Sequence, residues 1–78
     1  MYMDNKPLNR IKVVMAERMV SNKELGEMLN KDTATISRWV TNTSQPTLES
    51  LIEIAKALKC GIGDLVCMDD STILKNLD

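Results

Sequence analysis

Apolar residues recur along this chain at intervals of three and four positions, the spacing of one face of an α-helix. The strongest instance is the segment TLESLIEIAKAL, which Thr47 is placed to cap. Its apolar face comprises Leu48, Leu51, Ile54, Ala55 and Leu58. A helix is also predicted over about residues 8–19, with Pro7 near its first turn, and a short one over residues 62–66. The pattern predicts an all-α fold.

The first and last of these helices are predicted to contribute to one core. In the first, Ile11 and Val14 face inward, together with Met15 or the aliphatic stem of Arg18. In the last, Leu65 points inward.

Residues 21–42 have the features of two short helices around a tight turn. Ser21 can cap the earlier helix, and Glu24 three positions later completes a capping box. Asn30 ends that helix, because asparagine tolerates the left-handed conformation needed just past a helix terminus. Asp32 is placed to cap the later helix. The segment predicts a helix-turn-helix formed by the second and third helices of the chain.

The two helices of this motif are expected to pack closely at Gly26. Glycine inside a helix costs about 0.5–1 kcal/mol relative to alanine, so a close approach of the two helices is its expected compensation. Ile36 and Trp39, three positions apart, define the buried face of the later helix. The opposite face carries Thr33, Ala34, Ser37 and Arg38.

Charge is distributed unevenly along the chain, although the net charge is only −1. Residues 6–43, which contain the helix-turn-helix, carry a net charge of +3, and residues 44–78 carry −3. A basic half suits a polyanionic partner, and an ordinary solvated surface can show the same asymmetry. The distribution therefore supports nucleic-acid binding without establishing it.

Composition argues against an enzyme. The 78 residues suffice for one small core but not for an enclosed catalytic cleft. With no histidine and two cysteines, a four-ligand structural zinc site is not expected; Cys60 fits a small buried apolar side chain, and Cys67 follows a helix. No Gly-rich phosphate loop and no nucleophile–base pair is recognisable, so we expect no catalytic residue, cofactor, metal or small-molecule substrate.

Without an apolar run of ~20 residues or a signal peptide, the chain is expected in the cytoplasm rather than in a membrane.

Three segments, SNKELGEML, TATISRWVTN and QPTLESLIEIAKAL, together form a specific pattern. In combination they resemble the Cro and lambda-repressor type of DNA-binding domain, the XRE family, over about residues 8–66. The resemblance implies a five-helix, lambda-repressor-like domain over residues 8–67, between an N-terminal arm (1–7) and a C-terminal tail (68–78). It also implies that the third helix enters the major groove of a double-stranded DNA operator, commonly in a dimer.

Several positions depart from the family pattern. Met15 and Val40 stand where members often pair an arginine with a glutamate, so we expect an apolar contact to replace that ion pair. Asn22 is shorter than the glutamine that many members place there, and Lys31 occupies a commonly apolar position.

The resemblance also implies which residues contact DNA. Base contacts fall to Thr33, Ala34, Ser37 and Arg38. Arg38 is the sharpest candidate, because a guanidinium can bind guanine O6 and N7 together; a phosphate or a nearby carboxylate is an equally good partner. Phosphate contacts fall to Asn22, Lys23, Lys31, Thr35, Thr41, Asn42 and Thr43. The three loop residues among these are also ordinary turn formers.

These features predict a sequence-specific transcriptional regulator, most simply a small repressor. The alternative is a protein-interaction or antitoxin-like subunit on the same fold, using Met15, Val40 and the tail to contact another protein. We expect a homodimer, because Ile73, Leu74 and Leu77 make the tail more apolar than a solvated segment requires. The competing possibility is that these side chains cover the core of their own monomer.

Overall fold

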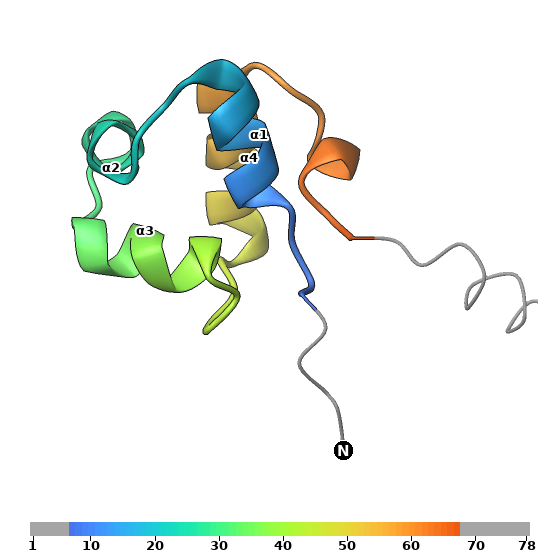
Figure 1. Cartoon of the computed structure of the whole chain (residues 1–78), viewed down its shortest axis with the longest axis horizontal. Helices are drawn as coiled ribbons and strands as arrows, with labels where there is room; N and C mark the ends of the chain where they lie inside the picture. The colour runs from blue at the N-terminus through green and yellow to red at the C-terminus, as the bar shows by residue number, and fades with distance from the viewer. Residues whose placement is uncertain (1–6, 68–78) are drawn as a thin grey trace, which may run out of the picture.

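The computed structural model describes residues 7–67, which form four α-helices and one turn of 3₁₀-helix (Figure 1). These are α1 (Ile11–Arg18), α2 (Asn22–Leu29), α3 (Thr33–Val40), α4 (Leu48–Leu58) and η1 (Ile62–Asp64). The predicted all-α fold is confirmed, and α2 and α3 form the predicted helix-turn-helix. The predicted fifth helix is only the single turn η1, although Leu65 after it is fully buried as expected.

The prediction that the first helix begins at Leu8 is wrong, because residues 8–10 pair with the end of the described chain. Asn9 and Val66 form an isolated antiparallel bridge. The N–H of Arg10 donates to Leu65 O at 2.7 Å, and the N–H of Cys67 donates to Leu8 O at 2.9 Å. These long-range bonds keep residues 8–10 out of the helix, so α1 begins at Ile11 and Pro7 lies outside its first turn.

The predicted caps of the other helices are confirmed. Ser21 and Glu24 form a reciprocal capping box at the start of α2. Asp32 accepts from the N–H of Thr35 at 2.8 Å at the start of α3, and Thr47 caps α4. At the end of α2, Asn30 adopts the left-handed conformation, with φ of 58°.

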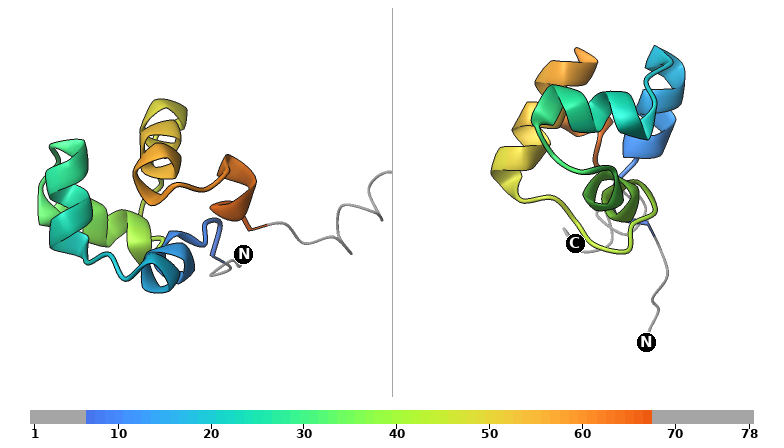
Figure 2. Two further views of the ribbon diagram at one scale, coloured as in Figure 1. Left: turned by 90° about the horizontal axis from the view of Figure 1, so that it is seen from above. Right: turned by 90° about the vertical axis from the view of Figure 1, so that its left-hand side faces the viewer.

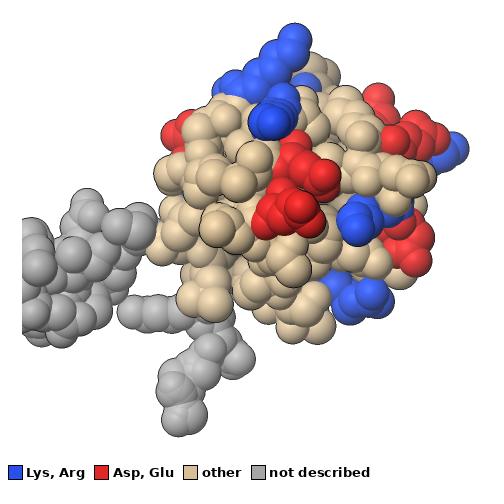
Figure 3. All heavy atoms as spheres, turned by 180° about the vertical axis from the view of Figure 1, so that it is seen from behind, with Lys and Arg blue, Asp and Glu red and all other residues tan. Residues whose placement is uncertain are grey.

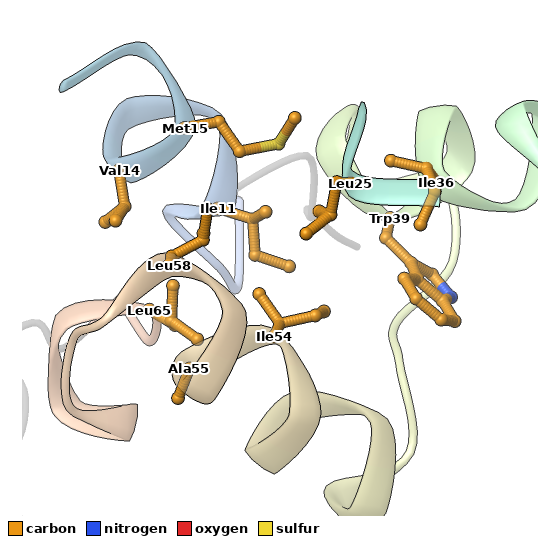
Figure 4. Close-up of a cluster of buried hydrophobic side chains, with 10 residues drawn as sticks. All are labelled: Ile11, Val14, Met15, Leu25, Ile36, Trp39, Ile54, Ala55, Leu58 and Leu65. Carbon is orange, nitrogen blue, oxygen red and sulfur yellow. The ribbon is translucent and has the colours of Figure 1, made fainter. Parts of the chain in front are cut away.

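The core lies where the four helices meet (Figure 4). It consists of Ile11, Val14, Met15, Leu25, Ile36, Trp39, Ile54, Ala55, Leu58 and Leu65. The inward-facing prediction holds along most of α4 but is wrong for Leu48, which is 69% exposed. Leu48 is the first residue of α4 and lies at the edge of the packed face, whereas Leu51, one turn on, is half-buried.

Helices α2 and α3 cross steeply, as Figure 1 and Figure 2 show. Gly26 belongs to α2 and is buried. A Cβ at this position would lie 2.7 Å from the backbone oxygen of Lys31, closer than real Cβ contacts allow. The N–H of Lys31 also donates to Gly26 O at 2.8 Å, so the turn is fastened directly against the glycine. The predicted close approach at Gly26 is confirmed.

Both cysteines are half-buried thiols. Cys60 packs against the core, so its predicted burial is only partial. Burial, followed by the nearby charge of Asp64, raises the pKa of Cys60, so its thiol stays protonated at neutral pH. Within residues 7–67 no helix has the length and apolar character to cross a membrane.

Candidate nucleic-acid interface

The two faces of α3 differ sharply in burial. Ile36 is fully buried and Trp39 is 8% exposed, so the inner face is anchored in the core. The predicted base-contacting residues lie on the other side: Thr33, Ala34 and Arg38 are exposed and Ser37 is half-buried. The helix is therefore held rigidly by one face while its opposite face presents short polar groups and one arginine.

Polar contacts connect the residues at the start of α3. Nη2 of Arg38 donates to Oγ1 of Thr35 at 3.3 Å, and the N–H of Thr35 donates to the carboxylate of Asp32. The hydroxyl and N–H of Thr35, with a smaller contribution from the charge of Arg38, lower the pKa of Asp32. Asp32 is thus ionised at neutral pH, and Thr35 lies between it and the arginine.

The start of α2 offers backbone donors beside a lysine. The capping box uses the N–H groups of Ser21 and Glu24, with distances of 2.9 and 3.0 Å. Those of Asn22 and Lys23 belong to the first helical turn, where N–H groups have no intrahelical partner. The hydrogen bonds from Ser21 also lower the pKa of Glu24. A helix start of this kind favours an anion.

Two predicted phosphate-contacting lysines are brought together at the turn of the motif. Lys23 and Lys31 line one open hollow of about 510 Å³, together with Thr33 at the start of α3. The hollow also includes the carboxylates of Glu27 and Asp32. It joins predicted phosphate contacts on α2 and the turn to the first predicted base contact on α3.

A second hollow, of about 250 Å³, adds a residue that the sequence analysis missed. Its lining is Lys12, Met15, Ala16, Val20, Ser21, Asn22 and Val40. Lys12 is the only charged residue among these, and it lies on α1 beside the predicted contact Asn22. Sequence reasoning considered α1 only for its buried face. Lys12 directly follows the buried Ile11, and adjacent helix residues do not share a face, so Lys12 could have been placed on the exposed side.

The same hollow contains Met15 and Val40, the predicted apolar replacement for an ion pair. Met15 is 4% exposed, and Val40 is half-buried and packs against the core. Both side chains therefore join α1 to the end of α3.

Comparison with known proteins agrees with this geometry. The family profile of the Cro/C1-type HTH DNA-binding domain matches residues 10–71. The chain belongs to the Cro/C1-type family of helix-turn-helix DNA-binding domains. It is also similar to a solved structure described as a "putative DNA-binding protein from Bacteroides fragilis". The two share 45% sequence identity over 77% of this chain and 97% of the other, with a TM-score of 0.76. None of the curated proteins gives a significant match.

The loop after α3 of this Cro/C1-type domain contains three of the predicted phosphate contacts. Thr41 and Thr43 are exposed, and their hydroxyl oxygens lie 2.8 Å apart. Asn42 differs, because its side-chain amide is turned into the protein. Its Oδ1 accepts from the N–H groups of Leu8 and Asn9, both at 2.9 Å. The structure thus gives the Asn42 side chain partners within the domain.

The face of the Cro/C1-type domain seen from behind carries charges of both signs among the described residues. Seen from behind, this face mixes acidic and basic side chains, with acidic ones near its centre (Figure 3). A polyanion meets no uniform attraction there. Among the described residues, no group of three or more His, Cys, Asp or Glu side chains is placed to hold a metal ion.

Proposed function

We propose that this chain is a sequence-specific transcriptional regulator, a small repressor that binds a double-stranded DNA operator with α3 in the major groove. The observation that carries the proposal is the burial pattern of α3. Its inner face is locked by Ile36 and Trp39, while its outer face is free to meet base edges. Membership of a DNA-binding family supports double-stranded DNA as the partner.

Sequence reading is assigned to the outer face of α3. Arg38 binds guanine through O6 and N7, which is worth about 1–3 kcal/mol of discrimination per base pair. Thr33 and Ser37 donate to or accept from base edges, and Ala34 contacts a thymine methyl group.

Orientation on the duplex is assigned to a ring of phosphate contacts around α3. On the α2 side we place Asn22 and Lys23, joined by Lys12 from α1 because it shares a hollow with Asn22. At the start of α3 and in the following loop we place Lys31, Thr35, Thr41 and Thr43. Asn42 is assigned to the scaffold instead, because its amide is bonded within the domain. Such contacts fix register and supply affinity without reading sequence.

We further propose that the regulator acts as a homodimer. One recognition helix reads only a few base pairs, and two copies on half-sites about 34 Å apart give useful specificity. The candidate dimer contact, residues 68–78 with Ile73, Leu74 and Leu77, lies outside the described residues. Sedimentation of the full chain and of a version ending at Met68 tests this assignment. A dimer only for the full chain supports it, and monomers in both cases contradict it.

The alternative, a protein-interaction or antitoxin-like subunit, relies on Met15, Val40 and the tail as its contact surface. Met15 is 4% exposed, so it offers little surface to a partner protein. Because such a regulator has to reach DNA, we propose that it acts in the cytoplasm rather than in a membrane.

The experiment that tests the proposed function is selection of binding sites from random DNA, followed by titration at rising salt. A specific regulator recovers one consensus and binds it at least about a thousandfold more tightly than random duplex. Its affinity also falls steeply with salt, since phosphate contacts release counterions. Recovery of no consensus, with weak binding to every duplex, contradicts sequence-specific regulation.

A further inference from the structure

Three amide side chains join the loop after α3 to the start of the domain. We call this cluster, Asn9, Asn42 and Gln45, the amide junction. Asn9 is 6% exposed; its Nδ2 donates to Trp39 O at 2.9 Å and to Gln45 Oε1 at 2.7 Å. Nδ2 of Asn42 donates to Asn9 O at 3.2 Å, and Nε2 of Gln45 donates to Asn42 Oδ1 at 3.1 Å. The junction therefore fastens both ends of the loop to one buried residue.

The backbone of the loop has the conformation that this junction requires. Asn42 has φ of 62°, in the left-handed region that few side chains other than asparagine tolerate. In that conformation its Oδ1 meets the N–H groups of both Leu8 and Asn9. The same residues 8 and 9 are bound to the end of the described chain, through Cys67 N–H and the bridge to Val66. Hydrogen bonds thus connect the loop to residues 8 and 9, and through them to residues 66 and 67.

We propose that Asn42 and Asn9 are positioning residues for DNA binding, which hold the loop in its binding conformation without touching DNA. This inference rests on the proposed function, because Thr41 and Thr43 on either side of Asn42 are its phosphate contacts. A loop that is already ordered does not lose conformational entropy on binding, so preordering raises affinity. Asn9 lies beneath the loop and acts through Asn42, Gln45 and the carbonyl oxygen of Trp39.

The test uses Asn42→Gly in the full chain, with Met19→Gly as the matched control. Asn42 and Met19 both have φ near 60°, so glycine keeps either backbone conformation while removing the side chain. Met19 ends α1, is 88% exposed and belongs to no proposed DNA contact. A third variant, Gln45→Ala, removes one exposed member of the junction. Urea unfolding first shows that each variant is folded.

Two quantities are measured for each variant. One is the hydrogen-exchange rate, without DNA, of the N–H groups of Asn42, Thr43 and Ser44, which bond back to Trp39 O and Arg38 O. The other is the affinity for a random-sequence duplex at low salt and for the selected operator. Asn42→Gly is expected to speed exchange in the loop and to weaken binding to both duplexes about tenfold, since freeing one or two residues costs that much. Gln45→Ala is expected to act in the same direction, by a few-fold, and Met19→Gly is expected to change neither quantity.

The outcomes distinguish a positioning role of Asn42 from direct contact with DNA and from a loop whose order does not affect binding. Weaker binding of Asn42→Gly with unchanged exchange would mean that its amide contacts DNA directly, which overturns the proposal. Unchanged binding with faster exchange would mean that loop order does not matter for binding, which also overturns it. If Asn42→Gly does not fold, the same two readings of Gln45→Ala decide. If the wild-type chain binds neither duplex, the proposed function fails, while the exchange rates still report whether the junction orders the loop.

Discussion

The guanidinium of Arg38 donates from Nη2 to the hydroxyl of Thr35, one turn earlier on the same helix, at 3.3 Å. This contact keeps a long, flexible side chain close to the recognition face instead of leaving it free in solvent. An arginine held in this way loses less conformational entropy when it binds a base. The hydrogen bond to Thr35 therefore favours Arg38 for the specificity role that we propose for it.

Arg38→Ala is accordingly expected to weaken operator binding much more than binding to random DNA. The expected loss on the operator is about 1–3 kcal/mol, or roughly 5- to 150-fold, because a bidentate contact to guanine is removed. Fluorescence anisotropy with the two duplexes measures both losses. Equal losses on both would reduce Arg38 to a phosphate contact.

Lys12→Gln is expected to lower the salt dependence of binding and to leave sequence preference unchanged. One lost phosphate contact reduces the slope of log K against log salt concentration by about 1 per domain bound. Lys56→Gln on α4 is the matched control, since Lys56 is also an exposed helix lysine but belongs to no proposed contact. A slope that changes equally in both variants, or in neither, would remove Lys12 from the interface.

Gly26→Ala is expected to destabilise the domain although alanine is the better helix former. The added Cβ would meet the backbone oxygen of Lys31 at 2.7 Å, and relieving such overpacking costs about 1–3 kcal/mol. Gly63→Ala is the control, because a Cβ there meets no atom within 4 Å. Its effect should stay within about 0.5 kcal/mol. Urea unfolding of both variants is the measurement. A Gly26→Ala protein as stable as the control would show that the backbone of the turn shifts to accept the added methyl group.

Sequence reasoning succeeded where the determinants are local. The caps at Ser21, Asp32 and Thr47 each depend on residues within three positions of one another, and all three formed as predicted. It failed at Leu8, because the residues that keep this segment out of α1 lie nearly sixty positions away, at the end of the described chain. A local interaction, the acceptance by Asn9 Oδ1 of a hydrogen bond from the N–H of Ile11 at 3.1 Å, also marks the start of α1, and the sequence analysis did not use it.

The same limit applied to the candidate site. The outer face of α3 followed from helical spacing, so all of its residues were named in advance. The scaffold role of Asn42 was not foreseen, because its partners Leu8 and Asn9 lie more than thirty positions earlier in the chain. Lys12 was missed for a similar reason: only the folded chain brings α1 beside the start of α2.

Stability at low pH is expected to depend on the charge of Asp32. Its pKa is lowered in the folded state from an ordinary 3.8, so its contribution is complete above that value. The contribution is lost as the pH falls through the folded pKa, when the carboxylate that caps α3 takes up a proton. Asp32→Asn keeps a good capping oxygen but cannot titrate.

The measurement is the free energy of unfolding of wild type and Asp32→Asn between neutral pH and pH 3. Glu24, whose pKa is also lowered, is present in both proteins, so its effect cancels in the difference. The advantage of wild type is expected to shrink below about pH 4. A difference that does not change with pH would show that the charge of Asp32 does not support α3.

The central claim, that α3 is the recognition helix, is tested most directly by NMR titration of the full chain with the selected operator. The largest shifts of backbone N–H signals are expected at residues 33–38, 22–23 and 41–43, with small shifts along α4. Largest shifts along the exposed face of α4, around Leu48 and Ile52, with α3 nearly unchanged, would contradict it.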